Sequence, residues 1–357
     1  MTASRDSAVF PGTLDAYEEL PPLDMPPAEG VIRACPEDFV VRERLGMAPE
    51  GGGEHLWLRI QKRALTTEEV ARLLARHAGV APRDVGYAGL KDRHAVTEQW
   101  FSIRKSSAAE EDWSKMLPPA VKVLEHSRHR RKIKKGALRG NAFEITVRKV
   151  RGDLGQVRAV CERLRDTGFP NYFGEQRFGR ERGNVARARA MLGGQQAVRD
   201  RFRRGLYLSA ARAEIFNRVL AARVRAGTWD TALAGDALVL DGSRSYFVEE
   251  QITGEIVARV KWGDLHPSGP LWGAGGPPTR AGVLALENEV AAGQPELKVG
   301  LSGYGMQHAR RPLRVIPKDL EARWLDAETL QLRFSLPAGS YATALLREIV
   351  RYESGCG

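Results

Sequence analysis

Alternation of hydrophobic and polar residues predicts β-strands in several parts of the chain. In residues 55–62, Leu56, Leu58 and Ile60 fall on one face, and charged or bulkier residues fall on the other. This period of two is typical of a strand that is buried on one side. Further extended segments are predicted at residues 31–44, 99–103, 143–147 and 330–336.

Helical periodicity marks several of the segments between these strands. Thr66-Thr67-Glu68-Glu69 has the spacing of a capping box, and apolar residues follow at helical intervals. Further helices are predicted over residues 154–164, over residues 209–224 behind a serine cap, and from residue 341 to about 352. Residues 263–282 are dense in glycine and proline and are predicted to form a long loop.

Strands and helices that alternate along one chain indicate an α/β (α+β) fold. The chain has 357 residues, of which 43% are hydrophobic, so it can bury a large core. This length favours two domains, or one domain that carries an insertion.

The charge of the chain is unevenly distributed. Lysine and arginine outnumber aspartate and glutamate by 55 to 44, which gives a net charge of +11. Residues 1–30 hold six acids and one base among several prolines, so we expect a loose acidic arm followed by a more basic body. A basic body favours a polyanionic partner, most often nucleic acid. The alternative is a soluble protein that simply has a high net charge.

The three cysteines, Cys35, Cys161 and Cys356, are odd in number and far apart. Their spacing supports neither a disulfide framework nor a structural zinc site. The sequence shows no apolar signal segment and no apolar run of membrane-spanning length. We therefore expect a cytoplasmic protein with no metal and no membrane contact.

Two segments of the chain are rich in basic residues. The first has no acid, and its seven bases are Arg128, Arg130, Arg131, Lys132, Lys134, Lys135 and Arg139. The second, residues 180–204, holds eight arginines against two acids. We expect such segments to contact phosphates, which sets affinity and register but not base identity. The alternative is a solvated surface loop.

The stretch Gly86-Tyr87-Ala88-Gly89-Leu90-Lys91-Asp92-Arg93-His94-Ala95-Val96-Thr97 sets a single carboxylate in a glycine-bearing turn. Lys91 and Arg93 flank Asp92, and nearby cations favour the ionised carboxylate. An ionised, positioned carboxylate can act as a nucleophile, a base or a metal ligand. The alternative is a surface turn with an ordinary ion pair.

A further segment combines rings, an amide and an arginine between glycines: Asn171-Tyr172-Phe173-Gly174-Glu175-Gln176-Arg177-Phe178-Gly179. An unstacked base could stack on such a ring and bond to the amide, although rings in a short segment are more often part of the core. The glycines do not form a P-loop, because Arg180-Glu181 follows where Lys-Ser/Thr is required. Motifs for dinucleotide binding, zinc proteases and serine hydrolases are absent from the sequence.

These segments, in this order, resemble the TruD family of tRNA pseudouridine synthases. The matching pieces are Pro36-Glu37-Asp38-Phe39-Val40-Val41, Ala88 to Ala95, Lys135-Gly136-Ala137-Leu138-Arg139-Gly140-Asn141, Asn171 to Gly179, and Leu336-Pro337-Ala338-Gly339-Ser340-Tyr341-Ala342-Thr343. Together they run from about residue 31 to residue 350, and five collinear pieces make the resemblance specific.

The resemblance implies an isomerase that converts uridine 13, in the D arm of tRNA, to pseudouridine without a cofactor. It implies a pseudouridine-synthase core with a mixed or antiparallel sheet, formed by residues 31–196 and 316–357, and an inserted TRUD domain at residues 197–315. Residues 1–30 would precede this core as the acidic arm. The implied partner is tRNA, and we expect a monomer.

The resemblance also assigns roles to individual residues. Asp92 falls on the family's catalytic aspartate, and a carboxylate suits a nucleophile that must attack and later leave. Phe39, Asn171 and Tyr341 fall on substrate-contacting positions, where Tyr341 adds a hydroxyl to a ring that is phenylalanine in family members. Supporting roles are predicted for Arg33, Lys91 and Phe173, with Arg33 as the cation beside Asp92.

Two other classes of function are alternatives to the enzyme. An RNA chaperone would use the same basic segments but would not depend on Asp92. Charge reversal at Lys132, Lys134 and Lys135 would abolish its activity, and Asp92→Asn would not. A DNA-binding regulator has less support, because the sequence carries neither a helix-turn-helix nor a zinc-finger pattern.

Overall fold

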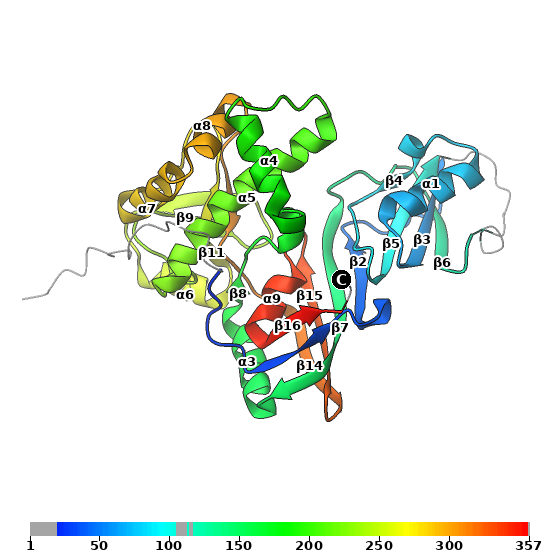
Figure 1. The fold of residues 1–357 in the computed structure, drawn as a ribbon, viewed down its shortest axis with the longest axis horizontal. Helices are drawn as coiled ribbons and strands as arrows, with labels where there is room; N and C mark the ends of the chain where they lie inside the picture. The colour runs from blue at the N-terminus through cyan, green and yellow to red at the C-terminus, as the bar shows by residue number, and fades with distance from the viewer. Residues whose placement is uncertain (1–19, 105–112, 114–116, 356–357) are drawn as a thin grey trace, which may run out of the picture. The chain divides into compact units, whose positions relative to one another are not determined.

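The computed structural model describes residues 20–104, 113 and 117–355, which form two compact units (Figure 1). The sheet unit contains the described residues of 26–162, 317–339 and 349–355. The helical unit contains residues 20–25, 163–316 and 340–348. Residues 1–19 of the predicted acidic arm lie outside the described residues. The expected division into a catalytic domain and a domain inserted at 197–315 stays a prediction.

The sheet unit is built on one mixed sheet, with ten strands among the described residues. Its strands are β1 (Ala28–Ile32), β2 (Phe39–Leu45), β3 (His55–Arg63), β4 (Gly86–Tyr87), β5 (Val96–Arg104), β6 (Val121–His129), β7 (Leu138–Gly152), β14 (Lys318–Asp326), β15 (Thr329–Pro337) and β16 (Val350–Ser354). The main path runs β14-β15-β7-β2-β5-β3-β6. β2 with β5 and β1 with β16 are parallel pairs, and the other pairs are antiparallel. This large mixed sheet confirms the predicted α/β class.

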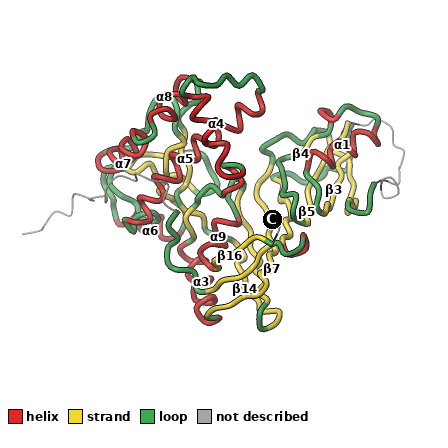
Figure 2. Tube along the Cα trace, in the orientation of Figure 1, coloured by secondary structure: helices red, strands yellow, loops and turns green. Residues whose placement is uncertain are grey.

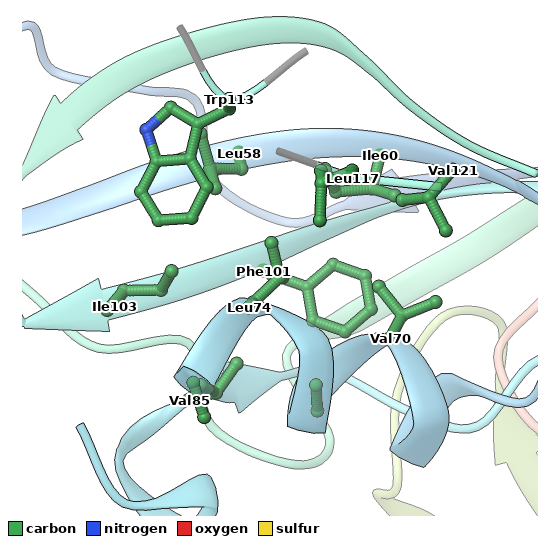
Figure 3. Packing of buried hydrophobic residues seen from close by; sticks show 12 residues of the cluster. Leu58, Ile60, Val70, Leu74, Val85, Phe101, Ile103, Trp113, Leu117 and Val121 are labelled. Carbon is green, nitrogen blue, oxygen red and sulfur yellow. The ribbon is translucent and has the colours of Figure 1, made fainter. Parts of the chain in front are cut away.

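Helix α1 (Thr67–Ala78) covers one face of strands β3 and β5. Its capping box is formed as predicted, since Thr66 accepts from the Glu69 amide and Glu69 accepts from the Thr66 amide. Val70 and Leu74 point from the helix toward Phe101 and Ile60 of the sheet (Figure 3). The predicted alternation of β3 is therefore confirmed, because its apolar face packs on the helix.

The opposite face of β3 packs on two loops. Trp57 is fully buried there against Ala88 and Ile133. Its indole N–H donates to the carbonyl oxygen of Arg131 at 2.9 Å. A single core side chain therefore contacts both the loop before Asp92 and the basic loop of residues 130–137.

The helical unit combines a helix cluster with small sheets (Figure 2). Its helices are α4 (Gly183–Leu192), α5 (Arg201–Arg225), α6 (Gly254–Trp262), α7 (Ala281–Ala292), α8 (Pro295–Gly303) and α9 (Ala342–Ile349). One sheet has the order β10 (Tyr246–Glu249), β9 (Asp236–Leu240), β11 (Leu265–Leu271) and β12 (Ala309–Pro312), and β13 (Arg314–Val315) pairs with β8 (Phe169–Pro170). The boundary between the units falls within α3 (Leu154–Thr167).

Some predicted elements differ from the structure. The helix expected over residues 209–224 begins earlier, because Asp200 caps α5 by accepting from the Arg203 amide at 2.6 Å. The long loop expected at residues 263–282 contains strand β11. The helix expected from residue 341 to about 352 ends at Ile349, since the chain then pairs with β1 as strand β16. Within 31–44, Pro36–Asp38 forms a 3-10 turn between two strands.

Among the described residues, no helix combines the length and the apolar character that crossing a membrane requires.

Candidate active site

Asp92 lies in the loop between β4 and β5, and its side chain is 35% exposed. Arg33 forms an ion pair with Asp92, and its Nη2 lies 3.5 Å from Asp92 Oδ2. Arg33 comes from the loop after β1, where its backbone adopts a left-handed φ of 56°. A partly exposed carboxylate beside a guanidinium stays accessible to a ligand while its charge is balanced.

Phe39 lies beneath Arg33 at the start of β2. The Arg33 guanidinium sits 4.1 Å from the centre of the Phe39 ring, and Phe39 also packs edge-on against Phe143. The ring is only 1% exposed. In this structure Phe39 therefore supports Arg33 through a cation–π contact, and a base could stack on its face only if Arg33 moved.

Lys91 points away from the Asp92 carboxylate. Its Nζ lies 2.9 Å from Glu43 Oε2 on β2, and both side chains are buried, at 4% and 0% exposure. The other Glu43 oxygen accepts from the Trp100 amide at 3.0 Å. The expectation that Lys91 and Arg93 hold Asp92 therefore needs correction: Lys91 anchors the turn to the sheet, and Arg93 is exposed.

Buried polar groups fix the main chain of the same turn. Thr67, the first residue of α1, accepts from the Lys91 amide at 2.9 Å and donates to Gln99 Oε1 at 2.8 Å. The Gln99 amide in turn donates to the Gly89 carbonyl at 3.1 Å. Lys62 donates to the Asp92 carbonyl oxygen at 2.7 Å. The turn is thus held by side chains from the core and not by its own exposed residues.

The basic loop packs against the segment that leads to Asp92. The Gly136 amide donates to the Ala88 carbonyl at 2.9 Å, and the Ile133 amide donates to Ser102 Oγ at 2.8 Å. A Cβ on Gly86 would lie only 2.4 Å from the Ile133 carbonyl oxygen, so this close approach requires glycine. Of the predicted phosphate contacts, the exposed ones are Arg130, Arg131, Lys134, Lys135 and Arg139, whereas Arg128 and Lys132 are partly buried.

Asn171 belongs to the helical unit and is 4% exposed. Its Oδ1 accepts from Arg311 at 2.6 Å, and its Nδ2 donates to the Pro312 carbonyl at 2.9 Å. Arg311 stacks on Phe173, with the guanidinium 4.0 Å from the ring centre. Burial among these groups lowers the pKa of Arg311 to about 10. Each end of the Asn171 amide is thus already engaged within the protein.

Tyr341 stands in the same unit, immediately before α9, and is partly buried. Its hydroxyl accepts from Arg177 Nε at 2.9 Å, and Arg177 Nη1 donates to Ser209 Oγ at 2.9 Å. The Tyr341 and Phe173 rings meet edge to face at 6.0 Å. The predicted residues Asn171, Phe173 and Tyr341 therefore lie in one cluster, linked through Arg177 and Arg311.

The part of the chain that the structure describes contains no group of three or more histidine, cysteine, aspartate or glutamate side chains arranged to hold a metal ion.

Sequence reasoning missed Glu43, Lys62 and Arg311, and it noted Arg177 without assigning it a role. Lys62 carried a signal, because it continues the apolar face of β3 after Leu56, Leu58 and Ile60. A lysine in such a position must find buried partners. Glu43 and Arg311 gave no comparable local signal, since their partners are distant in the sequence.

Comparison with known proteins identifies the family. The family model described as tRNA pseudouridine synthase D (TruD) matches residues 22–195 and 185–349. The tRNA pseudouridine synthase D of Nitrosococcus oceani is 48% identical over 96% of this chain and 95% of its own length. That of Methylococcus capsulatus is 46% identical over 91% of this chain and 92% of its own length. The chain therefore belongs to the TruD family of tRNA pseudouridine synthases.

A solved structure supports the same relation. The crystal structure of a Methanosarcina mazei protein, provisionally assigned as tRNA pseudouridine synthase D, superimposes with a TM-score of 0.66 at 25% sequence identity. The match covers 90% of this chain and 93% of that protein. The predicted family is confirmed, and with it the predicted class of enzyme, an isomerase of the pseudouridine synthase type.

Proposed function

We propose that this chain converts uridine 13, in the D arm of tRNA, to pseudouridine, with Asp92 as the nucleophile. The observation that carries the proposal is the Asp92 carboxylate, one third exposed and 3.5 Å from Arg33, in a turn that packs on a basic loop. The names of the relatives supply tRNA as the substrate.

The chemistry suits a carboxylate that can both attack and leave. The target base is extruded from the RNA, because a stacked base is out of reach of the side chain. Asp92 attacks either C1′ of the ribose or C6 of the pyrimidine, and the bond between N1 and C1′ breaks. The uracil then rotates, C5 bonds to C1′, and the bond to Asp92 breaks so that Asp92 regains its carboxylate. The proton leaves C5, and N1 ends protonated. Atoms and electrons balance, so the proposed reaction needs neither a cofactor nor a metal.

The contacts suggest separate roles for the other predicted residues. Arg33 balances the Asp92 charge, and Phe39 holds Arg33 in place. Tyr341 offers ring surface to a base of the tRNA, and Phe173 supports Asn171 through Arg311, which stacks on the Phe173 ring. The exposed bases of the basic loop, together with Arg139 at the start of β7, bind tRNA phosphates.

Unmodified tRNA transcripts test the proposal. Wild-type protein should form pseudouridine at position 13, mapped by chemical probing, in the presence of a metal chelator. Asp92→Asn should abolish the product and leave tRNA affinity and the unfolding transition unchanged. Asp166→Asn, at an exposed aspartate of α3, is the matched control and should stay active. Product at another position would refute the site in tRNA, and an active Asp92→Asn protein would refute the nucleophile.

A further inference from the structure

Lys62 occupies a core position of β3. It follows Leu56, Leu58 and Ile60 on the face that packs on α1, and it is 0% exposed. Its neighbours in register are Thr97 on β5 and Val121 on β6, both buried. An apolar residue would be the ordinary occupant of this position, because a lysine there must bury its charged end.

The buried ammonium contacts the main chain of the Asp92 turn. Lys62 Nζ donates to the Asp92 carbonyl oxygen at 2.7 Å and to the Leu65 carbonyl oxygen at 2.6 Å. Within the described residues it forms no ion pair. It therefore joins the residue that carries the nucleophile to the segment just before α1, and among the described residues no carboxylate lies within ion-pair distance of it.

Burial of the Lys62 ammonium lowers the stability of the fold. Burial lowers the pKa of Lys62 to about 8, and the negative charge of Asp92 opposes that shift. Charged groups that act on the ammonium are Asp92, Lys91, Glu68 and Glu69. A buried charge that no carboxylate pairs is an expensive way to satisfy two carbonyl groups, so stability alone gives a poor account of the residue.

We propose that Lys62 is a positioning residue for the transfer reaction. Its ammonium fixes the peptide of Asp92 and adds a second positive charge, besides Arg33, near the carboxylate. Asp92 must regain its negative charge when it leaves the covalent adduct, and fixed positive charge nearby favours that step. The inference rests on the proposed role of Asp92.

The variant Lys62→Met removes the ammonium and keeps an unbranched side chain of similar length. Since Lys62 is fully buried, tRNA affinity should be unchanged, whereas the single-turnover rate should fall ~100-fold, as expected when a reacting group loses its position. Lys122→Met, at an exposed lysine on the adjacent strand β6, is the matched control and should keep the wild-type rate.

The pH dependence of the single-turnover rate distinguishes a role of the Lys62 charge in positioning Asp92 from a purely structural role of the side chain. The readout is the ratio of wild-type to Lys62→Met single-turnover rates between about pH 7 and pH 9, because titration of the RNA affects both proteins alike. The ratio should fall as the pH rises through about 8, where Lys62 loses its proton. A ratio that is independent of pH, or a variant as fast as the wild type, would overturn the inference.

Two further outcomes are informative. Wild-type protein that makes no pseudouridine refutes the proposed function itself, whereas an active wild type with a pH-independent ratio refutes only the role of Lys62. Lys62→Gln provides a second neutral variant. If both variants lose their cooperative unfolding, the wild-type profile decides: a fall in rate centred near pH 8 supports the role of Lys62, and a rate that holds over the same range overturns it.

Discussion

The buried ion pair between Glu43 and Lys91 provides the sharpest test of how the Asp92 turn is held. Its atoms lie 2.9 Å apart, and the second Glu43 oxygen accepts from the Trp100 amide. In Glu43→Gln the shape and one acceptor remain, but the charge disappears. Lys91 is then buried without a counter-charge, and we expect the sheet unit to lose stability.

The size of the loss follows from the geometry. Coulomb's law at an effective dielectric constant of about 20 gives about 6 kcal/mol at the observed separation of 2.9 Å, as an upper bound. Removing one partner of a buried pair typically costs about 3–5 kcal/mol, and glutamine retains an acceptor, so we expect about 3 kcal/mol. Replacing both partners, as Glu43→Gln with Lys91→Met, should recover most of this loss, because no charge is left buried and the Trp100 amide keeps an acceptor.

Hydrogen exchange of peptides from β2 and β5, followed by mass spectrometry in increasing urea, measures this loss within the sheet unit. The Trp100 amide reports the pair directly, since it donates to Glu43. Glu29→Gln is the matched control: Glu29 pairs with Arg351 at a similar 3.0 Å, but both side chains are exposed. That change should cost less than about 1 kcal/mol. An equally small effect in Glu43→Gln would refute the reasoning.

Two further predictions concern Arg33 and Glu348. Arg33→Met should bind tRNA normally but lose turnover, measured as kcat against Kd, because the carboxylate loses its counter-charge; normal turnover would remove Arg33 from the mechanism. Burial raises the pKa of Glu348 from 4.5 to about 7, so its contribution to the stability of the helical unit is lost as the pH rises between these values. Glu348→Gln, which can still accept from the Leu23 amide, should therefore stabilise the protein by at most about 3 kcal/mol above pH 7 and by almost nothing near pH 4, in urea unfolding. A gain that is equal at both pH values would contradict this assignment.

Local sequence patterns were sufficient to predict those helices and strands whose sequence signals lie within a few residues of one another. The capping box of α1 and the alternation of β3 are examples. Strand β11 could not be predicted in this way, because Pro267, Gly269 and Pro270 all disfavour a strand. It forms because its first half pairs with β9 and its second half pairs with β12. Each proline therefore interrupts the pairing with only one of the two neighbouring strands.

The start of α5 shows a related limit. The four residues after its cap include Arg201, Arg203 and Arg204, and positive charge in a first turn opposes the helix dipole. Apolar periodicity favours the later start at Ser209. Packing of α5 on α4 and α8 buries enough surface to override that local preference.

The candidate site, too, could be predicted from the sequence only in part. Asp92 was recognisable from its turn and from the family resemblance, but the direction of each neighbouring side chain was not. The Lys91 side chain points away from Asp92 and toward β2. The cation beside Asp92 is Arg33, which belongs to a loop about sixty residues earlier in the sequence. Which cation pairs with which acid depends on how the strands pair, and the residues that determine strand pairing are distributed over the whole sheet.

Gly86 has a consequence that reaches beyond its own turn. Because no side chain fits between it and the Ile133 carbonyl, the basic loop lies in direct contact with the segment that leads to Asp92. On the proposed function, a larger residue at position 86 should therefore disturb RNA binding and the placement of Asp92 together.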